Sequence, residues 1–297
     1  MRHIVFLLSI SLLVAPDDAT AHGGGLNAEG GHYNRKTGDY HCHREPCFSN
    51  QQQQVKQRTP VAAPVDVGVL STNNTCNGLL PFGAPDKGDH KLCRTAYAVG
   101  VDCSKRGAAW VAYTVSRDIS DSANVERSND FRPDLELPEE CRKELYDFNG
   151  SYDRGHLVSA ETLDGSYKMN SETFLLSNMS PQLSGFNRAI WRGLENRERK
   201  WANQRGQLHV ITGPIHDGSG RMMGRVPVPT HYYKILFDPA SGKALSFIIP
   251  HQSLKTASLG RFISSIDEIE AITGIDFLSS LEDPVEAEIE RSVSAMW

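Results

Sequence analysis

The sequence lacks the excess of basic residues that most nucleic-acid-binding proteins carry. It has 31 Lys and Arg against 36 Asp and Glu in 297 residues, which gives a formal net charge of −5. A protein that binds nucleic acid is usually basic overall, so any polyanion site here must be a local patch. The apolar fraction of 39% and the charged fraction of 23% are compatible with a soluble globular protein that buries a sizeable core.

Long apolar runs are also missing. The run Ile4–Val14 has 11 residues, whereas a helix needs about 20 to cross a bilayer. It follows Met1–His3 and precedes Ala19–Ala21, so the segment has the three parts of a signal peptide. We predict that residues 1–21 are a signal peptide and that the mature chain is secreted or periplasmic, without a membrane span. The alternative is a buried N-terminal helix.

Several well-known catalytic signatures are absent. The sequence contains no Walker-type phosphate loop, no serine on a nucleophile elbow and no His-Glu-x-x-His pattern. These absences argue against nucleotide-driven, esterase and zincin activities. Five histidines beyond residue 76 lack ligand spacing and are interpreted as structural: His90, His209, His216, His231 and His251.

The chain has only six cysteines. In an exported protein they favour disulfides, and six cysteines allow 15 pairings. Two of them, Cys42 and Cys47, lie in a small His/Cys-rich module, residues 22–48. This stretch resembles Tyr-His-rich modules near the start of exported bacterial proteins, which implies no definite activity. The density of cysteine and histidine suits a soft-metal site, but no standard zinc spacing occurs. The alternative is a Cys42–Cys47 disulfide.

Residues 49–75 contain a run of four glutamines and two prolines without helical periodicity, which predicts a linker. The globular domain is therefore placed at residues 76–292. Within it, segments rich in β-branched and aromatic residues predict strands. These are residues 95–101, 108–115, 208–215, 231–237 and 244–249.

Two helices are predicted from apolar spacing. The first runs from Phe186 to about Asn203 with Ser184 as its N-cap, and the second covers 262–272 and ends at Gly274. The charged segment 118–143 is expected to be an irregular excursion, and the acidic tail 282–290 a solvated helix face. Strands in two runs with helices between them, without regular βαβ alternation, predict an α+β fold.

The segment Asp153-Arg154-Gly155-His156 carries side chains suited to phosphodiester cleavage. Histidine titrates near neutrality, so a neutral imidazole is available to activate water. The guanidinium of Arg154 suits phosphate oxygens, and Gly155 would let the backbone approach a metal or phosphate closely. Taken alone, His156 after a glycine favours a structural role over a catalytic one.

The first predicted helix adds metal-binding chemistry. Oxygen ligands suit Mg²⁺, which keeps several waters and takes few protein ligands, so Asn187 is a candidate direct ligand. Glu195 lies eight residues later, about 80° around an α-helix and about 12 Å along it. It is therefore expected to act through a metal-bound water. An exposed polar helix face is the alternative for both residues.

Basic side chains gather on the same helix. Residues 188–206 carry a net charge of +4. Such a run is either a solvated face with i,i+4 pairs or the local patch that a polyanion requires. Its basic members are Arg188, Arg192, Arg197, Arg199, Lys200 and Arg205.

Together these motifs resemble the DNA/RNA non-specific endonuclease family. The resemblance rests on residues 153–156, on the Thr-Phe-Leu-Leu-Ser-Asn-Met-Ser-Pro-Gln run at 173–182, and on Phe-Asn-Arg-Ala-Ile-Trp-Arg-Gly-Leu-Glu at 186–195. Flanking similarity extends it from about Leu79 to Leu281. The resemblance implies a mixed or antiparallel sheet core with a ββα-metal active-site motif and flanking helices.

The resemblance also implies roles for individual residues. His156 is the expected general base and Asn187 the expected direct ligand to Mg²⁺, with Mn²⁺ or another divalent ion as alternatives. Glu195 and Asn178 are expected to organise the water shell of the metal and the surrounding site. Arg154 and Arg127 are expected to stabilise phosphate charge.

The expected function is cleavage of DNA and RNA without strong sequence preference, leaving 5′-phosphate ends, which fits a site that contacts backbone rather than base edges. Two alternatives stay open. One is a non-catalytic nucleic-acid- or metal-binding protein on this fold, and the other is a metal-dependent phosphatase that acts on small esters.

Overall fold

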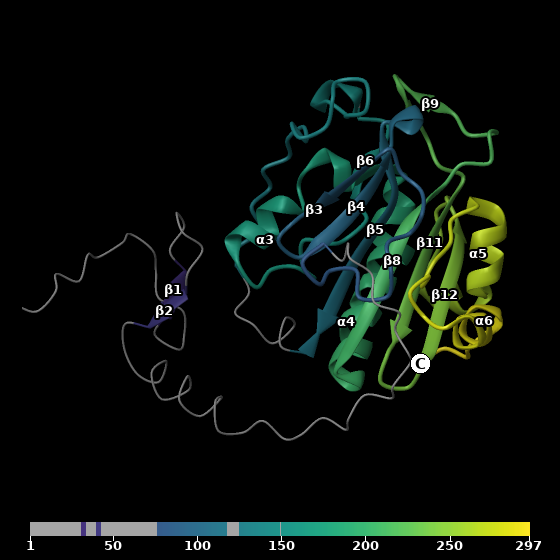
Figure 1. The fold of residues 1–297 in the computed structure, drawn as a ribbon. Coiled ribbons are helices and arrows are strands. Elements are labelled where there is room, and N and C mark those ends of the chain that lie inside the picture. Colours follow the sequence, from purple (N-terminus) through teal and green to yellow (C-terminus); the bar gives the residue numbers. More distant parts are fainter. Residues whose placement is uncertain (1–30, 34–39, 43–75, 118–124, 149) are drawn as a thin grey trace, which may run out of the picture. The chain divides into compact units, whose positions relative to one another are not determined.

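The computed structural model describes residues 31–33, 40–42, 76–117, 125–148 and 150–297 (Figure 1). The chain divides into two units, Met1–Gln53 and Gln54–Trp297. In the first unit, β1 (Gly31–Tyr33) and β2 (Tyr40–Cys42) form an antiparallel pair. The predicted signal peptide, the side chains of the His/Cys-rich module and the predicted linker lie outside the described residues.

The second unit is built on a seven-stranded antiparallel sheet in the order β13-β12-β11-β8-β5-β4-β3. Each of the five predicted strands is present and begins within two residues of its predicted start. The α+β prediction is confirmed. The strands are β3 (His90–Cys93), β4 (Tyr97–Asp102), β5 (Gly107–Ser116), β8 (Gln207–Ile215), β11 (His231–Asp238), β12 (Lys243–Pro250) and β13 (Ile263–Ser264).

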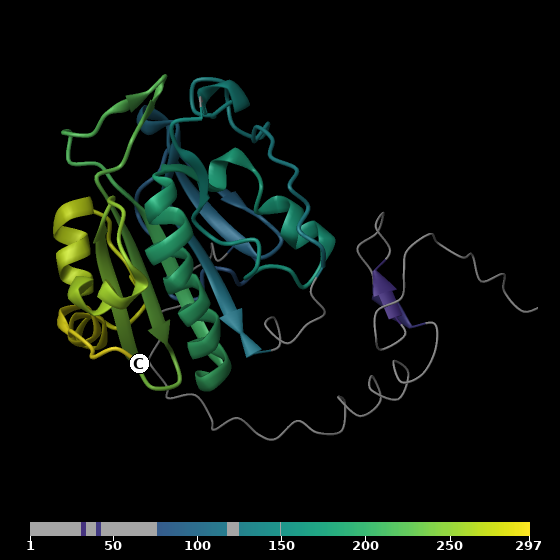
Figure 2. The ribbon, with the colours of Figure 1, turned by 180° about the vertical axis from the view of Figure 1, so that it is seen from behind.

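Both faces of this sheet are covered, because alternate residues of a strand enter different cores. Tyr232 and Leu236 of β11 pack in the core that contains Trp191 and Leu194. Helix α4 (Arg192–Arg205) covers that face, as Figure 2 shows. The intervening residue Ile235 packs in the second core, under α5 (Ile266–Thr273) and α6 (Asp283–Arg291). The unit therefore has three layers.

The second predicted helix begins later than expected. Phe262 ends the short helix η5 (Thr256–Phe262), and Ile263 pairs with β12 as part of β13. Helix α5 begins only after Ser265, whose hydroxyl accepts from the backbone of Glu268 in a capping box. The apolar spacing used for the prediction extends past Ser265 back to Phe262, so the predicted start was wrong. The predicted end at Gly274 is confirmed, since its φ of 60° is left-handed.

The acidic tail forms helix α6, as predicted, but it is not wholly solvated. Ile289 and Glu290 are buried, and α6 lies beside α5 at the edge of the unit (Figure 1). None of the described helices combines the length and apolar character that a bilayer crossing requires.

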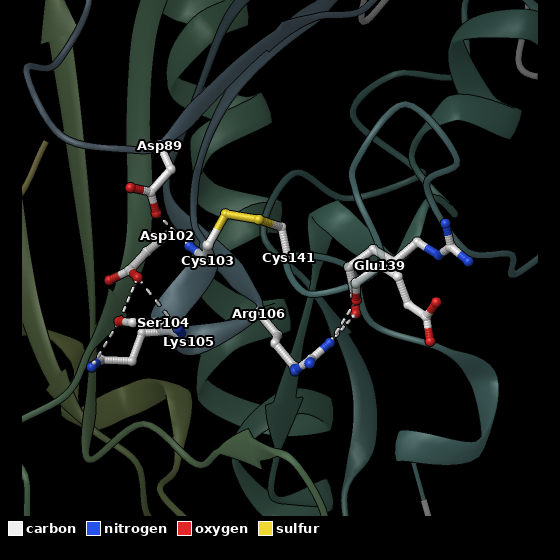
Figure 3. Close-up of a disulfide and its surroundings, with 9 residues drawn as sticks. Asp89, Asp102, Cys103, Ser104, Lys105, Arg106, Glu139 and Cys141 are labelled. Carbon is white, nitrogen blue, oxygen red and sulfur yellow. Dashed lines mark hydrogen bonds between the residues drawn. A yellow bond between two sulfur atoms is a disulfide. The ribbon is translucent and has the colours of Figure 1, made fainter.

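The predicted excursion contains no helix or strand in its described part, residues 125–143. One of two disulfides among the described residues, Cys103–Cys141, joins it to the short helix η1 (Cys103–Lys105) that follows β4. Figure 3 shows Arg106 beside this disulfide, donating to the Glu139 carbonyl at 2.7 Å. The other disulfide, Cys76–Cys93, closes a shorter loop.

The remaining short elements lie outside the large sheet. Strands β6 and β7 form their own antiparallel pair, and β9 pairs with β10. Their bounds, with those of the short helices, are η2 (Leu145–Asp147), β6 (Asp153–His156), α3 (Tyr167–Glu172), η3 (Leu176–Asn178), β7 (Met179–Gln182), η4 (Phe186–Trp191), β9 (Met222–Met223) and β10 (Val226–Pro227).

Candidate active site

Four of the predicted site residues, Arg154, His156, Asn187 and Glu195, lie on a unit of two strands and one helix. Strand β6 pairs antiparallel with β7, with Gly155 opposite Ser180 and His156 opposite Met179. The chain then enters η4, which continues into α4. The indole of Trp191 donates to the His156 carbonyl at 3.0 Å, so the end of β6 is tied directly to the helix.

Asp153 makes a second connection between β6 and the helix. Its carboxylate accepts from the Asn187 amide at 3.0 Å and from both Nε and Nη2 of Arg188. Burial works to raise the pKa of Asp153, but these hydrogen bonds outweigh it and hold the pKa below its ordinary value. The amide nitrogen of Asn187 is thereby committed to Asp153, and its oxygen faces elsewhere.

Ser184 does not cap the helix as predicted. Its hydroxyl donates to Asp153 at 2.9 Å, and the helical segment has no side-chain cap at its start. The first helical hydrogen bond runs from the Asn187 backbone N–H to the Leu183 carbonyl, so Ser184 already lies inside the first turn and cannot cap it.

His156 is buried, with 8% of its surface exposed. Its ring contacts Phe174 and Phe131 edge-on, with centroid distances of 4.9 and 5.8 Å. Burial, assisted by the positive charge of Arg127, lowers the pKa of His156 to about 3, so the imidazole is neutral at physiological pH. Its Nε2 is fully buried without a hydrogen-bond partner among the described residues. A buried unsatisfied nitrogen is costly, and a proton donor such as water would satisfy it.

Two arginines flank this imidazole through the same aromatic rings. The Arg154 guanidinium lies over Phe131 at 4.3 Å, and the Arg127 guanidinium lies over Phe174 at 4.7 Å. Both arginines are exposed, and neither forms an ion pair with a described residue. Stacking holds the two charges in place. Nε of Arg127 donates to Asn129 at 2.9 Å, which leaves its terminal N–H groups for an anion.

The sequence interpretation did not assign Phe131 and Phe174 to the site. Phe131 lies on the excursion, and Asp134 anchors this segment. The Asp134 carboxylate binds Arg94 of the β3–β4 turn at 2.6 Å and accepts from the Ser177 hydroxyl at 2.5 Å. Local sequence contains no signal for this packing, because Arg154 stacks on Phe131, 23 residues earlier, and Arg127 stacks on Phe174, 47 residues later.

The geometry of the helix differs from the expected regular α-helix. Residues Phe186–Trp191 form a π-helical turn, and the backbone N–H of Arg192 donates to the Asn187 carbonyl five residues earlier. Such a turn acts as a one-residue insertion. Glu195 therefore relates to Asn187 as an i+7 residue of an α-helix, about 20° from alignment, rather than the expected 80°. The π turn places both side chains on one face.

Glu195 is buried at 8% exposure. Burial raises its pKa to about 8, although Lys234 acts in the opposite direction. The negative charge of Glu195 also acts on Arg127, which in turn acts on His156. Arg127 therefore interacts electrostatically with both Glu195 and His156.

A buried ion pair holds α4 against the sheet. Lys234 of β11 binds Glu198 of α4 at 2.5 Å, and both side chains have no exposed surface. The hydroxyl of Tyr113 on β5 lies 3.0 Å from both partners, and the Lys234 ammonium lies over the Trp191 ring. Sequence patterns predicted an apolar strand here and missed this network.

Asn178 and Gly155 have structural tasks. The Asn178 amide oxygen accepts from the Val158 backbone, and its nitrogen donates to the carbonyls of Val158 and Thr173. Asn178 thus fixes the chain just after His156 rather than facing a ligand. A Cβ at Gly155 would lie 2.2 Å from the Gln182 side chain. Gly155 therefore makes room for Gln182, not for the expected metal or phosphate.

The predicted basic patch on the helix is partly neutralised. Arg188, Arg199 and Arg205 form ion pairs with Asp153, Glu161 and Asp238. Arg192 and Lys200 are exposed. The positive charge that acts on the imidazole comes from Arg127 rather than from the helical run.

The other histidines predicted to be structural have no role in this unit, with one exception. His251 accepts from the Leu183 backbone at 2.7 Å through Nε2, and its Nδ1 contacts the Pro229 carbonyl at 2.9 Å. It thus supports the residue that precedes the helix.

Comparison with known proteins agrees with this geometry. The pattern of the DNA/RNA non-specific endonuclease family matches residues 77–284. The chain belongs to this family. It is 31% identical over 257 residues to a nuclease of Nostoc sp., covering 82% of this chain and 91% of the relative. It is 27% identical to the nuclease of Serratia marcescens, covering 77% and 89% of the two chains.

A solved structure described as the EndoG/EndoGI complex, from a study of how EndoG is inhibited, has the same fold. It superposes with a TM-score of 0.64 at 27% identity and covers 72% of this chain and 95% of that one. Human mitochondrial endonuclease G is 30% identical over 220 residues, covering 68% of this chain and 74% of the relative. As a member of this family, the chain is a DNA/RNA endonuclease, and its family depends on a divalent metal.

The residues of the site fit a hydrated divalent cation. Asn187 has an amide oxygen turned away from Asp153, because its nitrogen is the atom bound there. Glu195 lies on the same helical face and has no ion pair with a described residue. One neutral oxygen ligand with a carboxylate behind it suits an ion that retains most of its waters.

Proposed function

We propose that the chain is an exported, Mg²⁺-dependent endonuclease that hydrolyses DNA and RNA and leaves 5′-phosphate ends. The observation that carries this proposal is the arrangement of β6. One end of the strand holds Asn187 through Asp153, and the other presents a buried, neutral His156 between two aromatic rings.

His156 is the proposed general base. It accepts a proton from a water molecule as the water oxygen bonds to phosphorus, and the bond from phosphorus to the 3′ oxygen breaks. The 3′ oxygen leaves and takes up a proton from solvent, to which His156 then releases the proton it accepted, and the phosphate stays on the 5′ side. A phosphodiester anion beside Arg127 offsets the charge that lowers the pKa of His156, so substrate binding strengthens the base. General-base catalysis contributes about 10²–10⁴-fold.

Arg127 and Arg154 are proposed to bind the phosphate oxygens. Their guanidinium groups are held over Phe174 and Phe131 and so lose little freedom when an anion binds. Asn187 would hold the divalent ion and Glu195 its water shell; when bound, the ion supplies Lewis-acid stabilisation of the developing charge. Contacts to phosphate carry no base information, which supports low sequence preference.

Export is proposed from two independent observations. The first 21 residues have the composition of a signal peptide. The nuclease unit also carries the disulfides Cys76–Cys93 and Cys103–Cys141, which persist in oxidising compartments.

The test compares polymers with a small ester in Mg²⁺, Mn²⁺ and Ca²⁺ after removal of bound metal. We expect plasmid and RNA to be degraded in Mg²⁺, a phosphomonoester to be untouched, and DNA fragments to be ligatable without kinase treatment. DNA binding without cleavage in any of the three metals would support the non-catalytic alternative. Fragments that ligate only after kinase treatment would contradict the proposed bond cleavage.

A further inference from the structure

A cluster of carboxylates lies between α5 and α6, on the sheet face opposite α4. Two overlapping groups of three have ligand oxygens within 4.8 Å of one another, and Glu290 belongs to both. No Lys or Arg in the described parts of the chain forms an ion pair with any member. The members are Asp267, Glu270, Asp276, Glu286 and Glu290.

One of the two groups contains two unsatisfied oxygens. Glu290 is only 7% exposed, and its Oε1 is fully buried without a hydrogen-bond partner in the described residues. Oε1 of Glu286 is also fully buried without a hydrogen-bond partner among the described residues. Glu286 and Glu290 belong to the group that contains Asp276. In the other group, Glu270 already accepts from the Phe277 backbone at 2.9 Å.

The carboxylates of Asp276, Glu286 and Glu290 lie close together in a partly buried environment, which disfavours their ionised forms. Burial, reinforced by the charges of Glu270 and Asp276, raises the pKa of Glu290 to about 9 and that of Glu286 to about 7. Burial and the charge of Asp86 raise the pKa of Asp276 above its ordinary value. Buried charges are stable only when they are paired or coordinate a metal. The group must therefore be protonated or hold a cation.

We propose that Asp276, Glu286 and Glu290 bind one Ca²⁺ that holds α6 against α5. Calcium–oxygen distances of about 2.3–2.6 Å allow ligand oxygens up to about 5 Å apart, and the ligand oxygens of this group all lie within 4.8 Å of one another. Mg²⁺ has shorter bonds of about 2.0–2.1 Å and a stricter octahedral geometry. Asp276 is exposed, so water can complete the six to eight ligands that Ca²⁺ takes.

The proposed calcium site is separate from the proposed catalytic metal site, so the test must measure calcium binding with the catalytic site disabled. Calcium is titrated calorimetrically into the metal-free full chain carrying Asn187→Ala, which removes the proposed catalytic ligand. We expect one Ca²⁺ to bind and saturating Ca²⁺ to raise Tm by about 5 °C. Adding Glu290→Gln should abolish both effects. Adding Glu288→Gln, an exposed change on the same helix, should preserve them.

Three results would overturn the proposal. These are absence of Ca²⁺ binding in the Asn187→Ala protein, unchanged affinity after Glu290→Gln, and Mg²⁺ binding as tight as that of Ca²⁺. Asp276→Asn is the second variant in case Glu290→Gln does not fold, and we expect it to weaken binding at least 10-fold. Nuclease activity in Mg²⁺ at 25 °C should be unaffected by Glu290→Gln alone. Failure of the calcium proposal would therefore not bear on the proposed catalytic function.

Discussion

Asn187 donates its side-chain amide to the Asp153 carboxylate, Nδ2 to Oδ2, over 3.0 Å. The contact joins the first residue of β6 to the helix that follows β7. It also decides the direction of the Asn187 amide oxygen, the atom proposed to hold the metal. Arg188 binds the same carboxylate, so the position of Asp153 is itself fixed.

The first prediction follows from this contact. Asp153→Ala should raise the Mg²⁺ concentration needed for half-maximal nicking and lower activity about 10–100-fold, the usual effect of removing a group that orients a metal ligand. Ser184→Ala removes a different hydrogen bond to Asp153 and is the matched control. An Asp153→Ala enzyme with unchanged Mg²⁺ dependence would contradict the positioning role.

The second prediction concerns the buried Lys234–Glu198 pair. Lys234→Met leaves Glu198 without its partner in a site with no exposed surface, and such a loss costs about 3–5 kcal/mol. Urea unfolding should show this decrease. The double variant Lys234→Met/Glu198→Leu should recover most of the stability, because no charge is then left buried. A double variant as unstable as the single one would refute this explanation.

The third prediction concerns acid stability and His209. Both ring nitrogens of this buried residue lack hydrogen-bond partners in the described structure, and burial lowers its pKa to about 4. Between pH 6.5 and 4 the unfolded state binds the proton more readily, so the stabilisation present above pH 6.5 is lost as pH falls. His209→Leu should remove up to about 3 kcal/mol of this loss. Parallel stability curves for the two proteins would contradict it.

The fourth prediction concerns the Cys103–Cys141 disulfide. Closing a loop of 38 residues stabilises by about 4 kcal/mol in the chain-entropy description. Replacing both cysteines with serine should lower the free energy of unfolding by about that amount and also impair nicking, because this disulfide anchors the excursion that carries Arg127 and Phe131. Serine at Cys76 and Cys93 is the control, with a similar stability loss and less effect on nicking at 20 °C. Equal losses of activity would contradict the link to the site.

The regular elements could be predicted because local patterns determine them. Segments rich in β-branched and aromatic residues located the strands, and Gly274 marked the end of α5. The start of α5 was misplaced because Ile263 continues the helical spacing while pairing as a strand. The apolar pattern of β11 likewise concealed Lys234, whose burial depends on Glu198 36 residues away.

The site residues could be nominated from their chemistry, but not their geometry. A regular α-helix separates Asn187 from Glu195 around its axis, and no local signal announced the π turn that realigns them. The role of Gly155 was also misread, since its neighbour Gln182 lies on the partner strand. The π turn and the contact between Gly155 and Gln182 both arise only when the strands pair and the helix packs.

The most direct test of the central claim is Mg²⁺-dependent nicking of supercoiled plasmid by the wild-type chain and by His156→Ala, with EDTA as the metal-free control. The variant should keep the far-UV circular dichroism and Tm of the wild type and lose about 10²–10⁴-fold in nicking rate, while EDTA stops the wild type completely. Nicking by a folded His156→Ala protein at the wild-type rate would contradict the assignment of His156 as the base.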